Sequence, residues 1–421
     1  MPGAVVEEGA LAPVPPAERI ATLDILRGFA LFGVLWSNLN DSYGAPDWYG
    51  MRHFPITLEG SFAWVQQWLI QDRFYTLLGF LFGIGFGIQL RRAEAAGGNA
   101  RTIFCRRLLA LLAFGVIHGT LIWSGDALTA YALVGFGLVL YGALPTRHLL
   151  AAAAATYFLL PYANHWIAAA LSLTPTSSRV PDVAQIYAHG TYAQIATLRV
   201  HQYLTYYAGY LARGFDSFLT LFVLGLWAER IGLASNLSGY ISRIRRALWI
   251  ALLCAAAGFF IRESLERWWP LSAAPFTSWF DPRFWSIRFV LQNSAHTLFY
   301  WGTAAAYAAA LTLLAQRPRW ARRLAPLAAV GRMTLTTYLM QSIICTTLFY
   351  SYGFGWYGRF GLAGMFMIAL TVFAFQIAAS TYWLRRFRFG PAEWLWRSLS
   401  YGRVQPMRLA LYALPGVASS Q

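Results

Sequence analysis

The sequence predicts an all-α fold, a polytopic bundle of about ten transmembrane helices with both chain termini in the cytoplasm. Hydrophobic residues make up 58% of the 421 residues and charged residues only 12%, and the mean hydropathy is +0.46. Apolar runs close to the roughly 20 residues that span a bilayer recur along the whole chain. Arginines gather in alternate loops between these runs, as expected for loops that stay in the cytoplasm.

The expected spans follow one another through mostly short connections. They are 23–39, 64–90, 108–123, 127–142, 149–171, 215–228, 247–261, 286–314, 330–350 and 362–384. Residues 1–17 are expected to form a disordered cytoplasmic tail ahead of a transmembrane domain, 18–388, and residues 389–421 a cytoplasmic C-terminal tail. Residues 172–213 are expected to hold amphipathic helix at the membrane interface, and the basic segment 317–323 to be a loop.

The net charge of +16 comes from arginine alone, because the sequence contains no lysine. These arginines lie in loops where membrane topology already requires them, so the charge does not indicate nucleic-acid binding. Contact with anionic membrane lipids explains it as well. The three cysteines, Cys105, Cys254 and Cys345, show neither metal-ligand nor disulfide spacing, and we expect no metal site.

Residues 117–128, I-H-G-T-L-I-W-S-G-D-A-L, place His118 and Asp126 in one of the most apolar parts of the chain. An ionisable group at membrane depth costs on the order of 2–3 kcal/mol, which makes it a candidate functional residue. His118 is expected roughly 15 Å into its span, and Asp126 at the outer turn. A carboxylate beside an imidazole fixes its tautomer and raises its basicity, as a general base requires. The alternative is a histidine that only joins helices, and the sequence leaves open whether the two side chains meet.

The first span carries a second set of polar residues. Asp24 and Arg27 are three residues apart, so they share a helix face and can neutralise each other. Asn38 follows Arg27 by eleven residues, about three turns, and lies on the same face near the other membrane surface. These residues form either a polar stripe along a cavity or a helix-end ion pair with an unrelated asparagine.

Other candidate binding residues are scattered over the chain. Arg332 and Gln341 belong to the polar stretch G-R-M-T-L-T-T-Y-L-M-Q-S, which is either a cavity wall or a set of interhelical contacts. Arg73 marks the outer start of the second span, and His53 lies in an outer loop. The arginines of residues 91–107 could hold the phosphates of a nucleotide cofactor, although topology alone would also explain them.

Motifs of well-known soluble enzymes are missing from the sequence. It has no GxSxG, HExxH or Walker A pattern. The glycines of residues 81–88, L-F-G-I-G-F-G-I, lack the strand context of a dinucleotide fold. They are typical instead of a helix that another helix approaches closely.

Several stretches resemble the bacterial YeiB-like inner-membrane proteins. They are T-L-D-I-L-R-G-F-A-L-F-G-V-L-W-S-N, H-G-T-L-I-W-S-G-D-A-L-T-A-Y-A-L-V-G, V-G-R-M-T-L-T-T-Y-L-M-Q-S-I-I-C-T-T-L-F-Y and R-R-F-R-F-G-P-A-E-W-L-W-R-S-L-S-Y-G. Together they cover most of the chain in the right order. The resemblance implies a multi-pass protein of the bacterial inner (cytoplasmic) membrane, from a cell-envelope family that is filed as uncharacterised or as transporters.

The opening L-D-I-L-R-G-F-A also resembles the first span of transmembrane acyltransferases. These include bacterial O-acyltransferases of envelope glycans and the lysosomal heparan-α-glucosaminide N-acetyltransferase. In the O-acyltransferases a catalytic histidine follows an arginine by eleven residues, and the matching residues here are Arg27 and Asn38. The lysosomal enzyme is similar in having asparagine there and its histidine further on. The resemblance therefore implies His118, or as a second candidate His53, as the base.

We expect a membrane-embedded acyltransferase that moves an acyl group from acyl-CoA, such as acetyl-CoA, to a hydroxyl or amine of an envelope glycan, lipid or small molecule. The expected catalytic residues are His118, Asp126 and Asn38, and the expected substrate- or cofactor-binding residues are Asp24, Arg27, Arg73, Arg332, Gln341 and His53. The alternative is a proton-coupled transporter or exporter of a small molecule or lipid, with the same residues along its path. Two further possibilities stay open: that the protein only assembles with partners and catalyses no reaction, and that it forms a homodimer.

Overall fold

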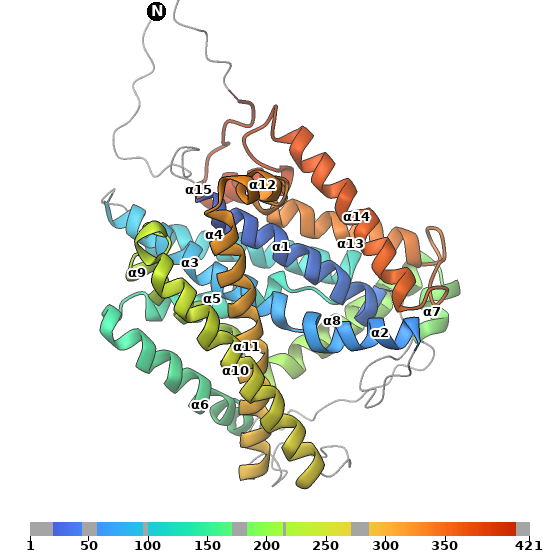
Figure 1. Ribbon diagram of the computed structural model, residues 1–421. Coiled ribbons are helices and arrows are strands. Elements are labelled where there is room, and N and C mark those ends of the chain that lie inside the picture. Colours follow the sequence, from blue (N-terminus) through green and yellow to red (C-terminus); the bar gives the residue numbers. More distant parts are fainter. Residues whose placement is uncertain are drawn as a thin grey trace, which may run out of the picture.

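The computed structural model describes residues 20–43, 57–95, 100–170, 183–213, 216–270 and 286–409. Within these ranges the chain is a bundle of α-helices, and its only β contact is an isolated bridge between Phe387 and Arg408. Figure 1 shows α1 crossing the middle of the bundle, while α10 and α11 run together and extend past the other helices. The predicted N-terminal tail lies outside the described residues.

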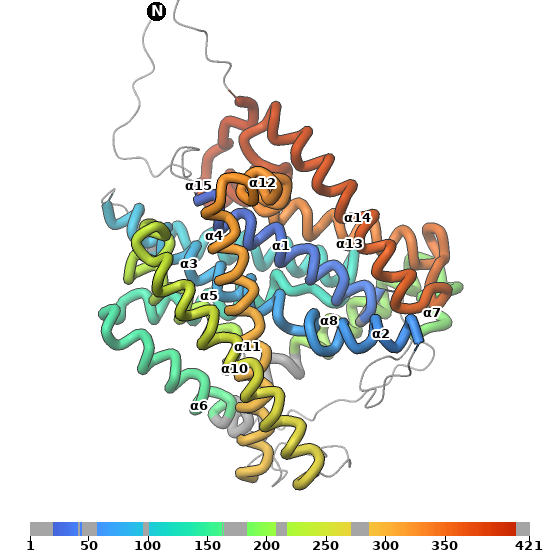
Figure 2. Tube along the Cα trace, in the orientation of Figure 1, coloured from blue at the N-terminus to red at the C-terminus, as the bar shows by residue number. Residues whose placement is uncertain are grey.

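Each of the ten expected spans corresponds to a helix. These helices are α1 (Ala21–Asn38), α3 (Arg73–Ala95), α4 (Ala100–Ile117), α5 (Leu128–Tyr141), α6 (Thr146–Ala170), α9 (Asp216–Arg230), α10 (Ile241–Trp268), α11 (Ile287–Ala315), α13 (Thr334–Phe349) and α14 (Leu362–Trp383). In the trace of Figure 2, α1 lies between α3 on one side and α13 and α14 on the other, and it packs against all three.

Five helical stretches of the described chain are long and apolar enough to cross a bilayer. They are Leu58–Ala95, Arg101–Ile122, Ser238–Trp268, Ile287–Ala315 and Leu362–Trp383. Their length and composition make this an all-α helical membrane protein. The figure of ten spans and the cytoplasmic location of both termini stay predictions.

Five further α-helices of the described residues join or cover these ten. They are α2 (Leu58–Val65), α7 (Val183–His189), α8 (Tyr192–Arg213), α12 (Pro318–Arg332) and α15 (Pro391–Tyr401). Helices α7 and α8 lie in the segment expected to be amphipathic. Helix α15 lies within the stretch assigned to the C-terminal tail.

The prediction of a loop at residues 317–323 was wrong, because helix α12 begins at Pro318. Proline is favoured at the first position of a helix, where its missing N–H leaves no hydrogen bond unmade. The expected span 330–350 is also divided, since α12 ends at Arg332 and α13 begins at Thr334. The arginines that suggested a loop instead form the polar side of a strongly amphipathic helix.

Helices α1 and α12 cross in direct backbone contact. A Cβ added at Gly28 would lie 2.0 Å from the carbonyl oxygen of Leu327, and one added at Gly331 would lie 1.8 Å from that of Asp24. Only glycine permits such an approach, since any side chain would collide with backbone. The crossing brings the end of α12, with Arg332, beside Asp24 and Arg27 at the start of α1.

Helix α15 is fastened to α13 by a buried carboxylate. Oε1 of Glu393 accepts the N–H groups of Leu335 and Thr336 at 2.6 and 3.1 Å, and Oε2 accepts the hydroxyl of Thr336. Burial raises the pKa of the Glu393 carboxyl above its usual value, and these hydrogen bonds offset only part of that rise. The carboxylate supplies acceptors that the first turn of α13 lacks. Trp396 adds a bond to the carbonyl of Arg107 at 2.8 Å, which ties α15 to α4.

The glycine-rich part of α3 packs on α9, as the sequence predicted. A Cβ at Gly83 would lie 2.0 Å from the carbonyl oxygen of Phe222, and one at Gly225 would lie 2.1 Å from that of Phe80. Gly85, on another face of α3, would place its Cβ 3.8 Å from the nearest guanidinium nitrogen. Gly83 and Gly85 are therefore unequal, because a methyl group has room at Gly85 and collides with backbone at Gly83.

We expect Gly83→Ala to destabilise the protein by about 1–3 kcal/mol, because the added methyl group forces two backbones apart. Gly85→Ala is the matched control, and helix propensity makes it neutral or stabilising by up to about 1 kcal/mol. Thermal unfolding of the detergent-purified protein, followed by circular dichroism, measures both. Equal melting temperatures for the two variants would contradict this packing.

Candidate active site and arginine-lined cavity

The chain changes its helical geometry at His118. Helix α4 ends at Ile117, and the next turn, His118–Ile122, is a wider π-helical turn that ends in extended backbone at Trp123. Such turns are rare and occur frequently at functional sites. The following residues turn back along α4, so that Asp126 returns to the level of His118 before α5 begins.

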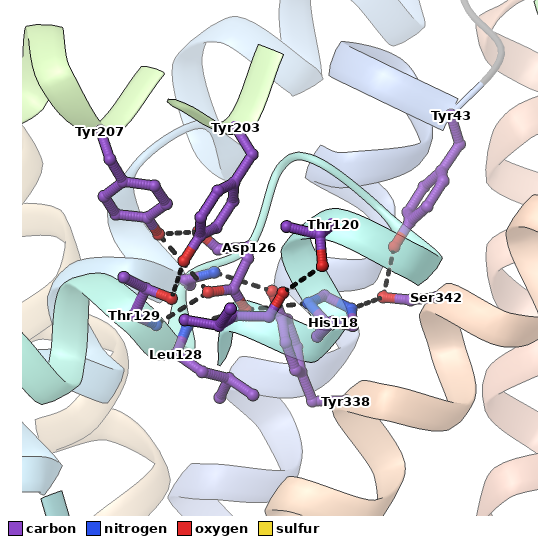
Figure 3. Close-up of polar contacts among 12 residues, drawn as sticks. Tyr43, His118, Thr120, Asp126, Leu128, Thr129, Tyr203, Tyr207, Tyr338 and Ser342 are labelled. Carbon is purple, nitrogen blue, oxygen red and sulfur yellow. Dashed lines mark hydrogen bonds and ion pairs between the residues drawn. The ribbon is translucent and has the colours of Figure 1, made fainter. Parts of the chain in front are cut away.

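The histidine and the aspartate form a direct hydrogen bond. Nδ1 of His118 lies 2.8 Å from Oδ1 of Asp126, and neither side chain is exposed. The same carboxylate accepts the N–H of Leu128 at 3.1 Å on Oδ1 and that of Thr129 at 2.8 Å on Oδ2. Figure 3 shows the carboxylate between the imidazole and the start of α5. Asp126 thus holds the first turn of α5 and the His118 ring together.

Ser342 forms a hydrogen bond with the other nitrogen of the imidazole. Its Oγ lies 2.8 Å from Nε2 of His118, and the hydroxyl of Tyr43 donates to the same Oγ at 2.7 Å. Figure 3 shows Tyr43, Ser342, His118 and Asp126 in one continuous series. The side chains of all four are buried. The site therefore joins residues from the turn after α1, from α13, from the π-helical turn after α4 and from the turn before α5.

Helix α8 covers this site. The hydroxyl of Tyr207 donates to the backbone carbonyl of Asp126 at 2.5 Å, and that of Tyr203 pairs with Thr129 at 2.7 Å. Arg199, wholly buried, donates to the carbonyl of Leu121 at 2.7 Å within the π-helical turn. These contacts hold the end of the π-helical turn and the residues that follow it.

A cavity of about 690 Å³ lies beside the site, between α1, α3, α4, α5, α12, α13 and α15. Of the described residues that line it, six are arginines and two are carboxylates. The arginines are Arg27, Arg91, Arg92, Arg107, Arg332 and Arg397, and the carboxylates are Asp24 and Glu393. They gather where α1 and α4 begin and α3 and α12 end, which we call the arginine end of the cavity. The remaining wall is mostly apolar and aromatic.

The arginines at this end are only partly satisfied by the protein. Arg107, Arg332 and Arg397 each have a buried Nε–H without a hydrogen-bond partner among the described residues. The guanidinium of Arg107 lies 4.1 Å from the centroid of the Trp396 ring. The pKa of Arg397 is lowered to about 10, mainly by burial and secondly by the positive charge of neighbouring Arg107. Arg397 therefore keeps its charge at neutral pH. The arginine end as a whole favours a ligand with several negative charges.

The inner end of the cavity stops one aromatic ring short of His118. Tyr338, Ala127 and Leu128 line the cavity, whereas His118 does not. The rings of Tyr338 and His118 have their centroids 5.1 Å apart, and the Tyr338 hydroxyl accepts the N–H of Ala127 at 3.1 Å. Tyr338 thus separates the cavity from the His118–Asp126 pair.

Two of the three first-span residues line this cavity, and the third lies behind its wall. Asp24 and Arg27 form the expected ion pair, with 2.9 Å between Oδ1 and Nη1, and both line the cavity. Asn38 is buried and accepts a hydrogen bond from the hydroxyl of Tyr75 at 2.5 Å on its Oδ1. Tyr75 lines the cavity, so Asn38 lies directly behind its wall.

The structure places other expected site residues elsewhere. Arg73 is fully buried outside the cavity lining, where it donates to the carbonyls of Gln67, Gln71 and Trp68 and stacks on the Tyr300 ring. It stabilises the irregular turn that precedes α3.

Gln341 donates to Oε1 of Gln376 at 3.1 Å and to the carbonyl of Leu31 at 3.3 Å, and so joins α13 to α14 and α1. Arg332 lines the cavity. His53 lies outside the described residues.

The chain matches one protein-family description and is similar to bacterial proteins over most of its length. Residues 228–403 match the family described as "Protein of unknown function (DUF418)". The chain is 34% identical over 427 residues to the Bacillus subtilis (strain 168) protein named "Uncharacterized protein YxaH". The alignment covers 94% of this chain and 98% of that relative. The chain is 30% identical over 413 residues to "Uncharacterized protein YeiB" of Escherichia coli (strain K12), with 92% and 98% covered. The chain belongs to the YeiB-like family. The family resemblance inferred from its motifs is confirmed.

Sequence reasoning singled out neither Ser342 nor Tyr43, although Ser342 and Tyr338 belong to the polar stretch that was named as a possible cavity wall. One signal was present, because residues 335, 338 and 342 follow the 3–4 spacing of a single helix face. Tyr43 gave no such signal, since it lies in the π-helical turn Leu39–Tyr43 after α1. Arg397 was hidden in a segment that was assigned to the tail.

We expect Asp126→Ala to destabilise this YeiB-like protein by about 3 kcal/mol, because it leaves the imidazole and two backbone N–H groups buried and unpaired. Asp126→Asn keeps a carbonyl acceptor and should reduce the stability of the folded protein clearly less than Asp126→Ala does. Thermal unfolding in detergent measures both, with Glu263→Ala, at an exposed position of α10, as the control. An Asp126→Ala variant as stable as the control would exclude this bridging role.

Proposed function

We propose that this YeiB-like protein is a membrane-embedded acyltransferase that moves an acyl group from acyl-CoA to a hydroxyl or amine. The observation that supports this most is the cavity itself, with clustered arginines at one end and the His118–Asp126 pair behind Tyr338 at the other. Acyl-CoA is strongly anionic at its nucleotide end and reactive at the far end of a long flexible arm. The two ends of the cavity match these two parts.

The nucleotide end of acyl-CoA would bind at the arginine end. Arginine holds phosphate through charge-assisted and often bidentate hydrogen bonds, and Arg107, Arg332 and Arg397 each have an N–H to spare. The 11 residues from Arg107 to His118 span roughly 16 Å at the rise of an α-helix. The arm of CoA would follow this apolar wall toward Tyr338. The arginine end would face the cytoplasm, in keeping with an inner-membrane location.

His118 would act as the general base in the transfer. As a hydroxyl or amine attacks the acyl carbonyl, Nε2 takes its proton, and the imidazolium then protonates the departing group. Asp126 keeps the ring in the tautomer with its proton on Nδ1 and stabilises the imidazolium. Asn38, held through Oδ1 by Tyr75, would offer its amide N–H groups to the oxyanion.

The acceptor would approach from the end of α4 opposite Arg107, where the turn of Asp126 lies. An envelope glycan, a lipid or a small molecule with a free hydroxyl or amine fits this arrangement. The acyl group then crosses from the cytoplasmic to the outer half of the bilayer without free diffusion of CoA.

Binding of CoA tests the arginine end. Replacing Arg107 or Arg397 with alanine should weaken binding about ten- to a hundred-fold, since each loss removes a charge-assisted interaction of about 1.5–3 kcal/mol. Isothermal titration of the detergent-purified protein with CoA measures this, and Arg317→Ala, at an exposed position, is the control. Undiminished binding in both cavity variants would exclude this site for the phosphates.

Transfer of a labelled acetyl group tests the base. His118→Gln should lower the rate at least a hundred-fold, the lower range for loss of a general base, while His201→Gln, at an exposed position of α8, should keep it. The assay follows label from acetyl-CoA into lipid and glycan fractions of membranes that contain the purified protein. If CoA does not bind and a solute moves only with a pH gradient, the transporter alternative replaces the enzyme.

A further inference from the structure

We propose that Ser342 is a nucleophile that carries the acyl group, so that transfer passes through an acyl-serine intermediate. This inference rests on the proposed acyltransferase function and names the route of the reaction. It begins from the contact between Ser342 Oγ and His118 Nε2, 2.8 Å apart, on the side of the imidazole opposite Asp126.

The hydrogen bonds of these residues have one consistent direction. The Asp126 carboxylate only accepts, so Nδ1 of His118 donates to it and carries the proton of the neutral ring. Nε2 then has a free lone pair, and the only hydrogen available on Ser342 points to it. The Tyr43 hydroxyl donates to Ser342 Oγ from the other side at 2.7 Å. A serine that donates to a histidine that donates to an aspartate is the arrangement that activates a hydroxyl for attack on an acyl group.

Helix α13 connects this serine to the cavity. Leu335 and Tyr338 line the cavity, and Ser342 follows them at the spacing of three and four residues that keeps one helix face. Ser342 is therefore the next residue on that face beyond the inner end of the cavity. A rotation of the Tyr338 side chain would open the cavity to Ser342 and to the imidazole together, because Tyr338 lies against His118.

Tyr43 is placed to stabilise the charge that develops during attack. It is buried, and its ring stacks on that of Trp123 with 4.3 Å between centroids, which fixes its position. As Oγ attacks the carbonyl, the acyl oxygen becomes negative next to Oγ. The Tyr43 O–H, released from Oγ, can donate to that oxygen from the position it already occupies.

The proposed reaction has two balanced half-reactions. First, Ser342 Oγ bonds to the thioester carbon of acyl-CoA, His118 Nε2 takes the serine proton, the C–S bond breaks, and the sulfur leaves with that proton as CoA thiol. Second, the acceptor hydroxyl or amine bonds to the acyl carbon of the serine ester, and Nε2 takes its proton. The bond from carbon to Oγ then breaks, and Ser342 regains its proton from Nε2.

A structural role for Ser342 predicts a different outcome. Buried hydroxyls in helical membrane proteins commonly join helices through hydrogen bonds. Such a serine would hold His118 in place and would never be modified. The two roles are therefore separated by covalent chemistry rather than by loss of activity alone.

The first experiment incubates the purified full-length protein with acetyl-CoA and no acceptor, and maps modified peptides by mass spectrometry. We expect one acetyl group on Ser342, with release of one CoA thiol per protein. The adduct should be absent in Ser342→Ala and His118→Gln and present in Thr346→Ala, which alters a buried hydroxyl one turn further on α13. If the wild type and Ser342→Ala both transfer acetyl to an acceptor and neither forms the adduct, transfer is direct and the proposal is overturned.

A second experiment does not depend on CoA. A fluorophosphonate probe reacts with activated serines, and we expect it to label Ser342 in the folded protein at least ten-fold faster than in His118→Gln. Labelling of Ser342 without any binding of CoA would support the nucleophile and refute acyl-CoA as the donor. Binding of CoA without labelling by the probe or acetylation would overturn the nucleophile and leave the proposed acyltransferase in place.

Discussion

The carboxylate of Asp126 is the group on which the arrangement of the site depends. It is buried, and a buried carboxylate is costly unless its oxygens accept hydrogen bonds. It accepts from the imidazole of His118 and from the first two N–H groups of α5. These bonds fix the return of the chain after the π-helical turn, and with it the relation of α4 to α5. The position of His118, and through Nε2 that of Ser342, follows from the need to satisfy one carboxylate.

The arginine end of the cavity differs from the Asp126 site, because its charges are not balanced within the protein. There the protein gathers more arginines than its own carboxylates can balance, and Asp24 and Glu393 are largely engaged with Arg27 and with the start of α13. Close approach of α1 to α12 at Gly28 and the docking of α15 make this gathering possible. A cavity with unbalanced cations at one end and a base behind its other end can bind an anionic ligand and act on the remote end of it. This polarity underlies the proposed use of acyl-CoA.

Much of the fold follows from local patterns that the sequence displays directly. The ten apolar runs, the ion pair of Asp24 with Arg27 and the close packing at Gly83 each depend on residues near in sequence or on the small size of one side chain. Helix α12 was missed because its arginines look like a loop when its amphipathic period is not considered. The candidate site was only half predicted, since His118 and Asp126 are conspicuous polar residues in apolar surroundings, whereas a serine within a helix is not.

The sequence by itself determined the class of protein, because a chain with so many apolar runs must bury them in a bilayer or in one another. It also determined which polar residues are exceptional, because charges within such runs are costly. Only the tertiary structure decided whether those residues meet. A π-helical turn and a reversal of the chain brought Asp126 to His118, and contact between segments far apart in sequence brought Ser342 to the imidazole and Tyr43 to Ser342. Such contacts depend on how helices cross, which no local pattern of residues records.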